Sequence, residues 1–284
     1  MNENGCGKLY ITATPIGNLG DMSPRAVQVL KEADLIAAED TRNTIKLLNH
    51  FEIRTPMTSY HEFNRFDKAD ELVGKMLQGT DVAIVTDAGT PCISDPGEVL
   101  VQKCIEAGIE VTSIPGPSAV ITALTLSGFS VRRFVFEGFL PPKQKKRDRQ
   151  QALARIKDET GTIVLYEAPH RLKETLKELM GLLGADRRIA MCREMTKKHE
   201  EVIRTTLKEA SETEPRGEYV LVVEGKDPEE LEEERQAAFE DMSLEEHVDM
   251  YLAKGMDKKA AMKAAATDRG MSKRDVYNAL EREK

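Results

Sequence analysis

Residues 82–97, VAIVTDAGTPCISDPG, form the stretch around which the rest of this sequence can be arranged. The stretch begins as a short apolar run bounded by turn-forming residues, which is typical of a buried parallel strand. It then breaks at Thr86–Pro91 and again at Ser94–Gly97, where Ser94 or Asp95 could cap a helix that begins near Pro96. Because ligands of open α/β sheets bind beyond the carboxyl ends of strands, this loop is a candidate ligand cradle. A plain strand-to-helix turn is the alternative.

Strand-like and helix-like segments alternate on both sides of this stretch, which predicts an α/β fold with a mostly parallel first sheet. In the first half we expect strands at 8–13, 35–38, 82 onward and 109–114, with helices at 24–33, 67–78 and 97–107 and another around Ile45–Leu48. In the second half we expect a nearly all-apolar helix at 119–126 and strands at 133–137, 162–166, 188–192, 201–206 and 219–224. Only a short segment separates the last two strands, so the second sheet should be mixed.

The sequence pattern predicts that the chain has four parts. A boundary at Pro115–Ala119 separates an N-terminal α/β domain (1–116) from a second α/β domain (117–226). An acidic linker (227–242) follows, with eight acidic residues against Arg235 between 227 and 241. A C-terminal helical module (243–284) reads as three short helices, the first two ending at Gly255 and Gly270.

Composition excludes several classes of protein. The 284 residues are 40% hydrophobic and contain no apolar run near the ~20 residues that span a bilayer, and no signal peptide precedes the first strand. Four scattered cysteines without a Cys/His cluster predict a cytoplasmic protein without a metal site. The chain also lacks a GxGxxG fingerprint after the first strand, a P-loop and a GxSxG elbow.

Two basic stretches stand out in a chain of net charge −8. Residues 143–157 hold seven basic residues against Asp148, a local charge of +6, and residues 255–274 hold six against two aspartates, a local charge of +4. The cations that we predict to bind RNA in these stretches are Lys143, Lys145, Lys146, Arg147, Lys258, Lys259, Lys273 and Arg274. A solvated helix face is the alternative for the first stretch, and a dimerisation or docking element is the alternative for the second.

Eight ordered motifs resemble one family closely. They are TPIGNL at 14–19, AEDTR at 38–42, SYHE at 59–62, DAGTP at 87–91, SDPG at 94–97, PGPSA at 115–119, GFLP at 138–141 and YEAPHR at 166–171. Together they resemble the ribosomal RNA small subunit methyltransferase I family of the tetrapyrrole (class III) methylase superfamily, from about residue 8 to 225. One departure is Phe63, where a second histidine often follows Glu62, and it weakens a catalytic role for that position.

The resemblance implies two α/β domains with the cofactor cleft between them and a small helical tail. It also implies S-adenosylmethionine-dependent methylation of a cytidine ribose 2′-hydroxyl in the decoding region of 16S rRNA, in the small ribosomal subunit. The implied cofactor-binding residues are Pro15, Asp87, Ala88, Gly89, Ser118, Ala119, Leu165 and Tyr166. For Ser118, the alternative is a simple helix cap.

A ribose hydroxyl is a weak acid, so a general base would accelerate its methylation. The candidates at predicted strand ends or loops are Glu39, Asp40, His61, Glu62 and Glu167, although a dedicated base need not exist. Three arginines, Arg42, Arg65 and Arg171, could hold the phosphates that flank the target nucleotide. Each acidic candidate could equally be an ion-pair partner of one of these arginines.

Two other functions remain open from the residues alone. One is a tetrapyrrole C-methyltransferase of the same fold, and the other is a non-enzymatic regulator that binds nucleic acid through its tail. We also expect a homodimer.

Overall fold

The computed structural model describes residues 5–239 and 242–282. The chain divides into two compact units, each made of two segments. The first unit contains the chain up to Leu153 together with Thr162–Glu224. The second unit contains Ala154–Gly161 together with the chain from Gly225. Both sheets belong to the first of these units. Within the described residues, no helix is long and apolar enough to cross a membrane.

The first sheet has five strands in the order β3–β2–β4–β1–β5. Their bounds are β1 Leu9–Thr12, β2 Leu35–Ala38, β3 Met57–Ser59, β4 Val82–Val85 and β5 Val111–Ile114. Every pairing is parallel, as predicted, and β4, the start of the opening stretch, lies at the centre. Parallel strands deliver their carboxyl ends to one edge, so the loops after these strands gather there.

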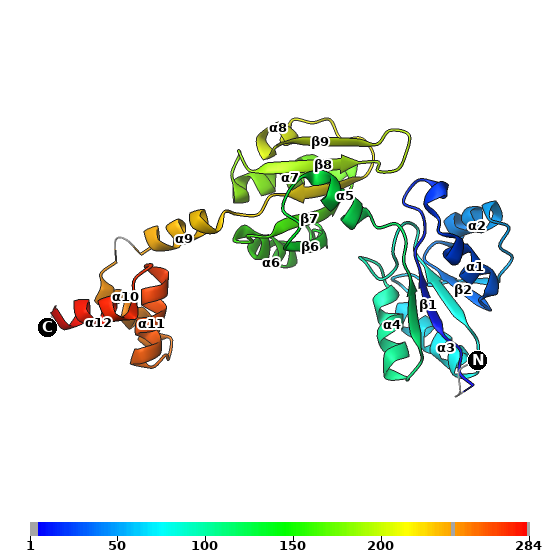
Figure 1. Ribbon diagram of the computed structural model, residues 1–284, viewed down its shortest axis with the longest axis horizontal. Coiled ribbons are helices and arrows are strands. Elements are labelled where there is room, and N and C mark those ends of the chain that lie inside the picture. Colours follow the sequence, from blue (N-terminus) through cyan, green and yellow to red (C-terminus); the bar gives the residue numbers. More distant parts are fainter. Residues whose placement is uncertain (1–4, 240–241, 283–284) are drawn as a thin grey trace. The chain divides into compact units, whose positions relative to one another are not determined.

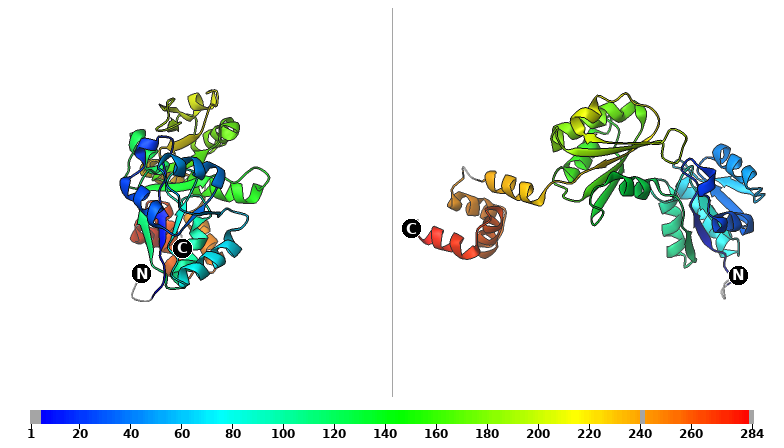
Figure 2. Two further views of the ribbon diagram at one scale, coloured as in Figure 1. Left: turned by 90° about the vertical axis from the view of Figure 1, so that its right-hand side faces the viewer. Right: turned by 45° about the horizontal axis from the view of Figure 1, so that its top comes forward.

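Helices cover both faces of this sheet (Figures 1 and 2). Their bounds are α1 Pro24–Glu32, preceded by a short 3-10 turn, η1 Leu19–Asp21, then α2 Thr41–His50, α3 Arg65–Leu77 and α4 Gly97–Glu106. Ala83 and Val85 face α1 and α2, whereas Val82 and Ile84 face α3 and α4. Because side chains alternate along a strand, burial on both faces explains why β4 is apolar at every position.

The second sheet is mixed, in the order β6–β7–β10–β8–β9. Its strands are β6 Phe134–Phe139, β7 Thr162–Glu167, β8 Arg188–Arg193, β9 Glu201–Thr206 and β10 Tyr219–Val223. β6 and β7 are parallel and the other pairs are antiparallel, so the sheet is mixed, as predicted. The reason given for that prediction does not hold, because the short segment with α8 (Leu207–Ser211) joins β9 to β10, and these two strands are not paired with each other.

Three longer helices belong to this second half of the chain: α5 Ala119–Ser127, α6 Lys146–Lys157 and α7 Pro169–Leu183. The apolar helix α5 packs through Val120, Ala123 and Leu124 against one face of the sheet. This face includes Val164 and Val222, so the predicted helix closes one side of the second core, but it is buried on one face only, since Ile121 is 50% exposed.

The C-terminal region contains four helices among the described residues: α9 Pro228–Ala237, α10 Leu244–Ala253, α11 Lys258–Asp268 and α12 Lys273–Arg282. The predicted acidic linker is therefore helical over most of its length, although residues 240 and 241 lie outside the described part. Gly255 and Gly270 adopt left-handed backbone conformations after α10 and α11, as their roles as helix stops predict. A cluster that includes Val248, Ala265 and Val276 forms the apolar interior of α10–α12.

Candidate active site

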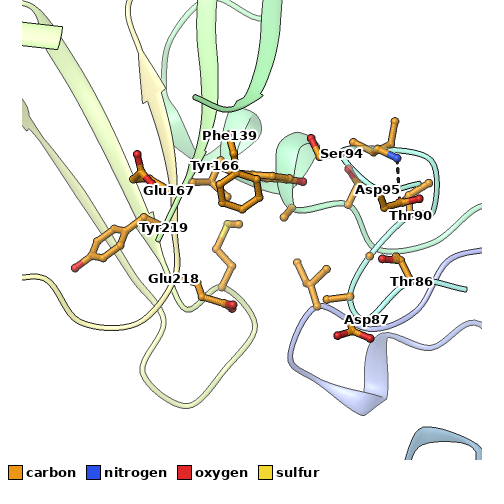
Figure 3. A pocket seen from close by; sticks show the side chains of 18 of the residues that line it. Thr86, Asp87, Thr90, Ser94, Asp95, Phe139, Tyr166, Glu167, Glu218 and Tyr219 are labelled. Atoms are coloured by element: carbon orange, nitrogen blue, oxygen red, sulfur yellow. Dashed lines mark hydrogen bonds between the residues drawn. The ribbon is translucent and has the colours of Figure 1, made fainter. Parts of the chain in front are cut away.

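A cavity of about 400 Å³ lies between the two sheets of the first unit (Figure 3). On one side it is lined by the loop after β4, and on the other by residues at the ends of β6, β7, β8 and β10. Figure 3 shows Phe139, Tyr166 and Glu167 on the side opposite Thr86 and Asp87. The volume lies within the ~300–1,000 Å³ usual for small-molecule sites.

The loop after β4 is held by the loop after β1. Thr14 and Gly89 exchange two backbone hydrogen bonds, of 2.9 and 3.1 Å between nitrogen and oxygen. Gly89 has a φ of +85°, and a Cβ there would lie 3.2 Å from Ile16 Cγ2. Glycine is required because a left-handed backbone conformation and a close neighbour coincide, so the DAGTP motif gives the loop a defined shape at the cavity wall.

Asp87 anchors this loop to the start of α2. Its Oδ1 accepts a hydrogen bond from the Asp40 backbone N–H at 3.2 Å, and its Oδ2 accepts one from Asn43 Nδ2 at 3.1 Å. Asp87 remains open to the cavity, but partial burial raises the pKa of its carboxyl group, and the neighbouring Glu39 and Asp40 carboxylates raise it further. The predicted ligand loop thus carries a carboxylate that already has two partners.

The second turn of the opening stretch is strained. Cys92 and Ser94 have φ values of 71° and 65°, a left-handed backbone conformation that residues other than glycine seldom adopt. Asp95 holds the turn, because its carboxylate accepts the backbone N–H groups of Ile93 at 3.2 Å and Gly97 at 2.8 Å. Strain of this kind concentrates at ligand sites, and Ser94 and Asp95 both line the cavity.

The expected role of Pro96 was wrong in detail. Pro96 occupies the N-cap position of α4 instead of its first turn, and no side chain caps this helix. Asp95 still serves the helix start, because it bonds the amide of Gly97, the first helical residue.

The opposite wall is aromatic. The Tyr166 ring lies 5.0 Å from the Phe136 ring and 5.4 Å from the Phe139 ring, centroid to centroid. Burial raises the pKa of the Tyr166 hydroxyl to about 12, and a backbone hydrogen bond with Val120 orients that hydroxyl. Ser118 and Ala119 complete this wall; Ser118 takes the N-cap position of α5 without a side-chain capping bond.

One predicted cofactor residue points elsewhere. The Leu165 side chain is fully buried and lines neither this cavity nor an adjacent one of about 360 Å³, because Leu165 is the neighbour of Tyr166 on β7 and faces the opposite side of the sheet. Pro15 does not line this cavity either, but it lines the adjacent one.

The five candidate bases have different environments. Glu39 lines the cavity, accepts a hydrogen bond from Thr86 Oγ1 at 2.5 Å through Oε2, and has no partner for Oε1 among the described residues. Glu167 also lines it but is 2% exposed, with bonds from Thr175 Oγ1 and the Ala168 amide. His61 lines neither cavity.

The remaining two acids pair with arginines, as the alternative interpretation predicted. Arg42 binds Asp40 through two hydrogen bonds, of 3.0 and 2.6 Å, which lower the pKa of the Asp40 carboxyl group to about 2. Arg65 Nη1 lies 2.6 Å from Glu62 Oε2. Neither acid lines the cavity, so Glu39 is the candidate whose position and free oxygen suit a base.

Arg171 also has partners within the fold. Its guanidinium donates to the Leu140 carbonyl oxygen and lies 3.4 Å from Glu167 Oε1. Arg149, in the first basic stretch, is 5% exposed and binds Glu178, Thr175 and the Pro141 carbonyl. Both arginines hold the GFLPP segment instead of facing solvent.

The other predicted RNA-binding cations lie on the surface. Lys143 pairs with Glu174, whereas Lys145, Lys146 and Arg147 are exposed and form no ion pair with another described residue. In the helical tail, Lys258, Lys259 and Arg274 are exposed, and the side chain of Lys273 lies outside the described part. Arg269 of the same stretch donates instead to His247 Nδ1 at 3.0 Å, inside the helical module.

Sequence reasoning missed the loop between β8 and β9. Glu194, Met195 and Lys197 of this loop line the cavity, as does Glu218 just before β10. Lys197 Nζ lies 3.0 Å from Glu218 Oε2 and 3.2 Å from Glu194 Oε2. The available signal was the run of polar residues after a predicted strand, the same signal that had singled out Glu39–Arg42 after β2.

The fold and this cavity define a methylase of the tetrapyrrole type. The family model described as "Tetrapyrrole (Corrin/Porphyrin) Methylases" matches residues 8–211. Among solved structures, the uroporphyrin-III C-methyltransferase of Thermus thermophilus matches with a TM-score of 0.55 and 17% identity over 77% of this chain and 94% of that one. A cobalt precorrin-4 methyltransferase matches with a TM-score of 0.59 and 16% identity over 78% and 97%. At such low identity these likenesses show the fold.

Relatives with higher sequence identity show which family within the tetrapyrrole methylases this chain resembles. The ribosomal RNA small subunit methyltransferase I of Halalkalibacterium halodurans is 48% identical over 98% of this chain and 96% of its own length. Its counterpart in Bacillus subtilis is 47% identical over 98% and 97%. The chain therefore belongs to the ribosomal RNA small subunit methyltransferase I family, within the tetrapyrrole methylases, and is a methyltransferase.

Proposed function

We propose that this protein transfers a methyl group from S-adenosylmethionine to RNA of the small ribosomal subunit. The acceptor we infer is the 2′-hydroxyl of a cytidine in the decoding region of 16S rRNA. The observation that supports the proposal most directly is the cavity between the two sheets, where small residues face an aromatic wall in a chain closely related to named rRNA methyltransferases.

The residues of the cavity fit S-adenosylmethionine. Tyr166 and Phe139 offer an apolar surface for an adenine ring, and Ala88 and Gly89 allow close approach to backbone groups. The start of α5 lacks a side-chain cap, so the amides of its first turn other than that of Val120, which bonds Tyr166, can receive a carboxylate. When bound, the cofactor supplies a methyl group already activated by its sulfonium charge.

The protein then has two tasks, which are positioning the acceptor and receiving its proton. In-line positioning of the hydroxyl can supply much of the rate acceleration. Glu39 is the base that we propose, because its Oε1 has no partner among the described residues and its Oε2 is fixed by Thr86. The hydroxyl proton would pass to this carboxylate as the oxygen–methyl bond forms and the sulfur–methyl bond breaks, with the electron pair of that bond remaining on a neutral thioether.

The substrate is proposed to be an assembled particle. A chain of net charge −8 has little general attraction for RNA, and its exposed basic residues are concentrated in short stretches. Recognition then depends on a surface that matches these stretches in shape, which a folded ribosomal subunit provides. Such a substrate would place the enzyme in the cytoplasm. We also propose that the protein is a homodimer, and analytical ultracentrifugation would measure its oligomeric state.

The test is a methyl-transfer assay with labelled S-adenosylmethionine and small subunits from cells that lack this enzyme. We expect label in 16S rRNA, and nucleoside mass spectrometry should identify 2′-O-methylated cytidine. Uroporphyrinogen serves as the second acceptor, since a tetrapyrrole C-methyltransferase would label it instead. Failure to bind S-adenosylmethionine in calorimetry, together with no transfer to either acceptor, would contradict the proposal.

A further inference from the structure

A second cavity, of about 360 Å³, lies beside the first. The two cavities share a wall formed by Ile16, residues 86–88, Lys197 and Glu218. The rest of the second cavity is lined by the loop after β1 and by one side of α2, including Asn43, Lys46 and Leu47. A molecule in the second cavity would therefore lie next to a cofactor in the first.

The lining combines an apolar surface with a few polar groups. Pro15, Leu19 and Leu47 supply the apolar part, and Asn43 and Lys46 supply hydrogen-bond donors. Lys46 is exposed and forms no ion pair with another described residue. A nucleotide has the matching chemistry, since its base has apolar faces and polar edges and its phosphate is an anion.

The buried hydroxyl of Thr44 supports the binding of a ligand in this cavity. Thr44 lines this cavity and is only 4% exposed, and its Oγ1 has no hydrogen-bond partner among the described residues. An unpaired buried hydroxyl is costly, and a polar group of a molecule bound in this cavity would supply a partner.

Two loops are closely packed where they meet at the shared wall. A Cβ on Gly17 would lie 2.4 Å from Lys197 Cγ and 2.9 Å from Thr196 Oγ1, so the loop after β1 touches the loop between β8 and β9. Glu194 and Thr196 have φ values of 48° and 64°. This strained backbone holds Lys197 at the wall that both cavities share.

We propose that the second cavity is the subsite for the target nucleotide, an inference that rests on the proposed function. The base lies against Leu19 and Leu47, the ribose lies at the shared wall, and Lys46 meets a flanking phosphate. Methyl transfer requires the reacting atoms to approach within about 3–3.5 Å, which adjacent cavities allow. The nucleotide must leave its stack to enter, as nucleotides recognised in single-stranded RNA do.

The decisive variant is Leu47→Trp, which fills the second cavity from a residue that does not line the first. The matched control is Ile45→Trp, on the same helix but outside both cavities and 43% exposed. We expect Leu47→Trp to lower kcat/KM on small subunits at least tenfold, with the dissociation constant for S-adenosylmethionine within twofold of the parent. Ile45→Trp should match the parent in both measurements.

Two results would overturn the subsite. Equal activity of Leu47→Trp and Ile45→Trp would show that the cavity takes no part in the reaction. Weakened binding of S-adenosylmethionine in Leu47→Trp would assign the cavity to the cofactor instead. If the parent itself transfers no methyl group to subunits, the proposed function fails and the subsite with it, whereas an active parent with an unaffected variant rejects the subsite alone.

A surface variant decides the question if Leu47→Trp does not fold. Lys46→Met removes one exposed cation, and Lys31→Met on α1 is its control outside the cavity. We expect Lys46→Met to raise KM for subunits and to reduce the slope of log affinity against log salt by up to about one unit. An unchanged KM and an unchanged slope would reject the proposed phosphate contact and the subsite.

Discussion

The hydroxyl of Thr86 donates a hydrogen bond to Glu39 Oε2 across 2.5 Å, and this contact joins the ends of the neighbouring parallel strands β2 and β4 at the cavity wall. The bond fixes one oxygen of the carboxylate and leaves the other facing no described partner. A carboxylate held in this way is oriented without being neutralised, which is the arrangement that a general base requires.

Replacing Glu39 with glutamine keeps the size of the side chain and removes its basicity. If Glu39 receives the acceptor proton, Glu39→Gln should lower kcat by about 10²–10⁴-fold while S-adenosylmethionine affinity stays near that of the parent. Single-turnover transfer to small subunits measures the effect. Glu62→Gln is the control, because Glu62 pairs with Arg65 and lies outside the cavity. Equal rates for the two variants would mean that positioning alone drives the reaction.

Asp87→Ala should weaken S-adenosylmethionine binding by at least about tenfold. The substitution removes the acceptor for two hydrogen bonds, from the Asp40 amide and from Asn43, each contributing about 0.5–1.5 kcal/mol. The loop after β4 would then lose its attachment to α2. Isothermal titration calorimetry measures the affinity, and a near-native value would remove this loop from the cofactor site.

Asp87→Asn should change how stability depends on pH. Burial raises the pKa of Asp87 above its ordinary value of 3.8, so the folded state keeps this proton to a higher pH than the unfolded state does. The parent therefore loses stability as the pH rises through the interval above 3.8, whereas asparagine does not titrate. The Tm difference, variant minus parent, should become more positive across that interval and then level off.

Thermal melts from pH 3 to pH 7 in steps of about half a unit test this sign. A Tm difference for Asp87→Asn that is constant with pH would contradict the raised pKa.

Arg149 and Arg147 lie on the same helix, but substitution by methionine should destabilise the fold only at Arg149. Arg149 is 5% exposed and binds Glu178 and the Pro141 carbonyl, so Arg149→Met leaves a partly buried carboxylate without its partner. We expect a loss of about 3 kcal/mol in the free energy of unfolding, near the lower limit for broken buried pairs because Glu178 retains some solvent. Arg147→Met should stay within about 0.5 kcal/mol. Urea unfolding distinguishes them, and equal stabilities would be evidence against the buried pair.

The exposed basic residues before and at the start of α6 should contribute to RNA binding but not to cofactor binding. Replacing Lys145, Lys146 and Arg147 together with alanine should weaken binding to small subunits and flatten log affinity against log salt by up to about one unit per cation. S-adenosylmethionine affinity should not change. If these side chains serve only solubility, the triple variant will bind subunits with the salt slope of the parent.

The sequence by itself predicted the fold because the relevant signals are local. The apolar run at Val82–Val85, the Pro24 start of α1 and the left-handed Gly255 each reflect the conformation of a few adjacent residues. The same local signals placed every strand except β3 to within about two residues and located the cavity loop at Asp87–Gly89, whereas the short strand β3 at Met57–Ser59 was not predicted. For these features, the periodicity of apolar side chains and the residues found in the turns are enough to predict the local structure.

The tertiary structure decided the roles of individual side chains. Arg149 counted toward the charge of the first basic stretch, but its partner Glu178 lies 29 positions along the chain, and only the packing of α6 against α7 brings the two side chains together. Leu165 and Tyr166 are adjacent in sequence, and their orientation in the sheet sends one to a core and the other to the cavity. Lys197 reaches the site because its loop meets Gly17, 180 residues away. Charges and cavities depend on which distant segments meet, and no local pattern records that.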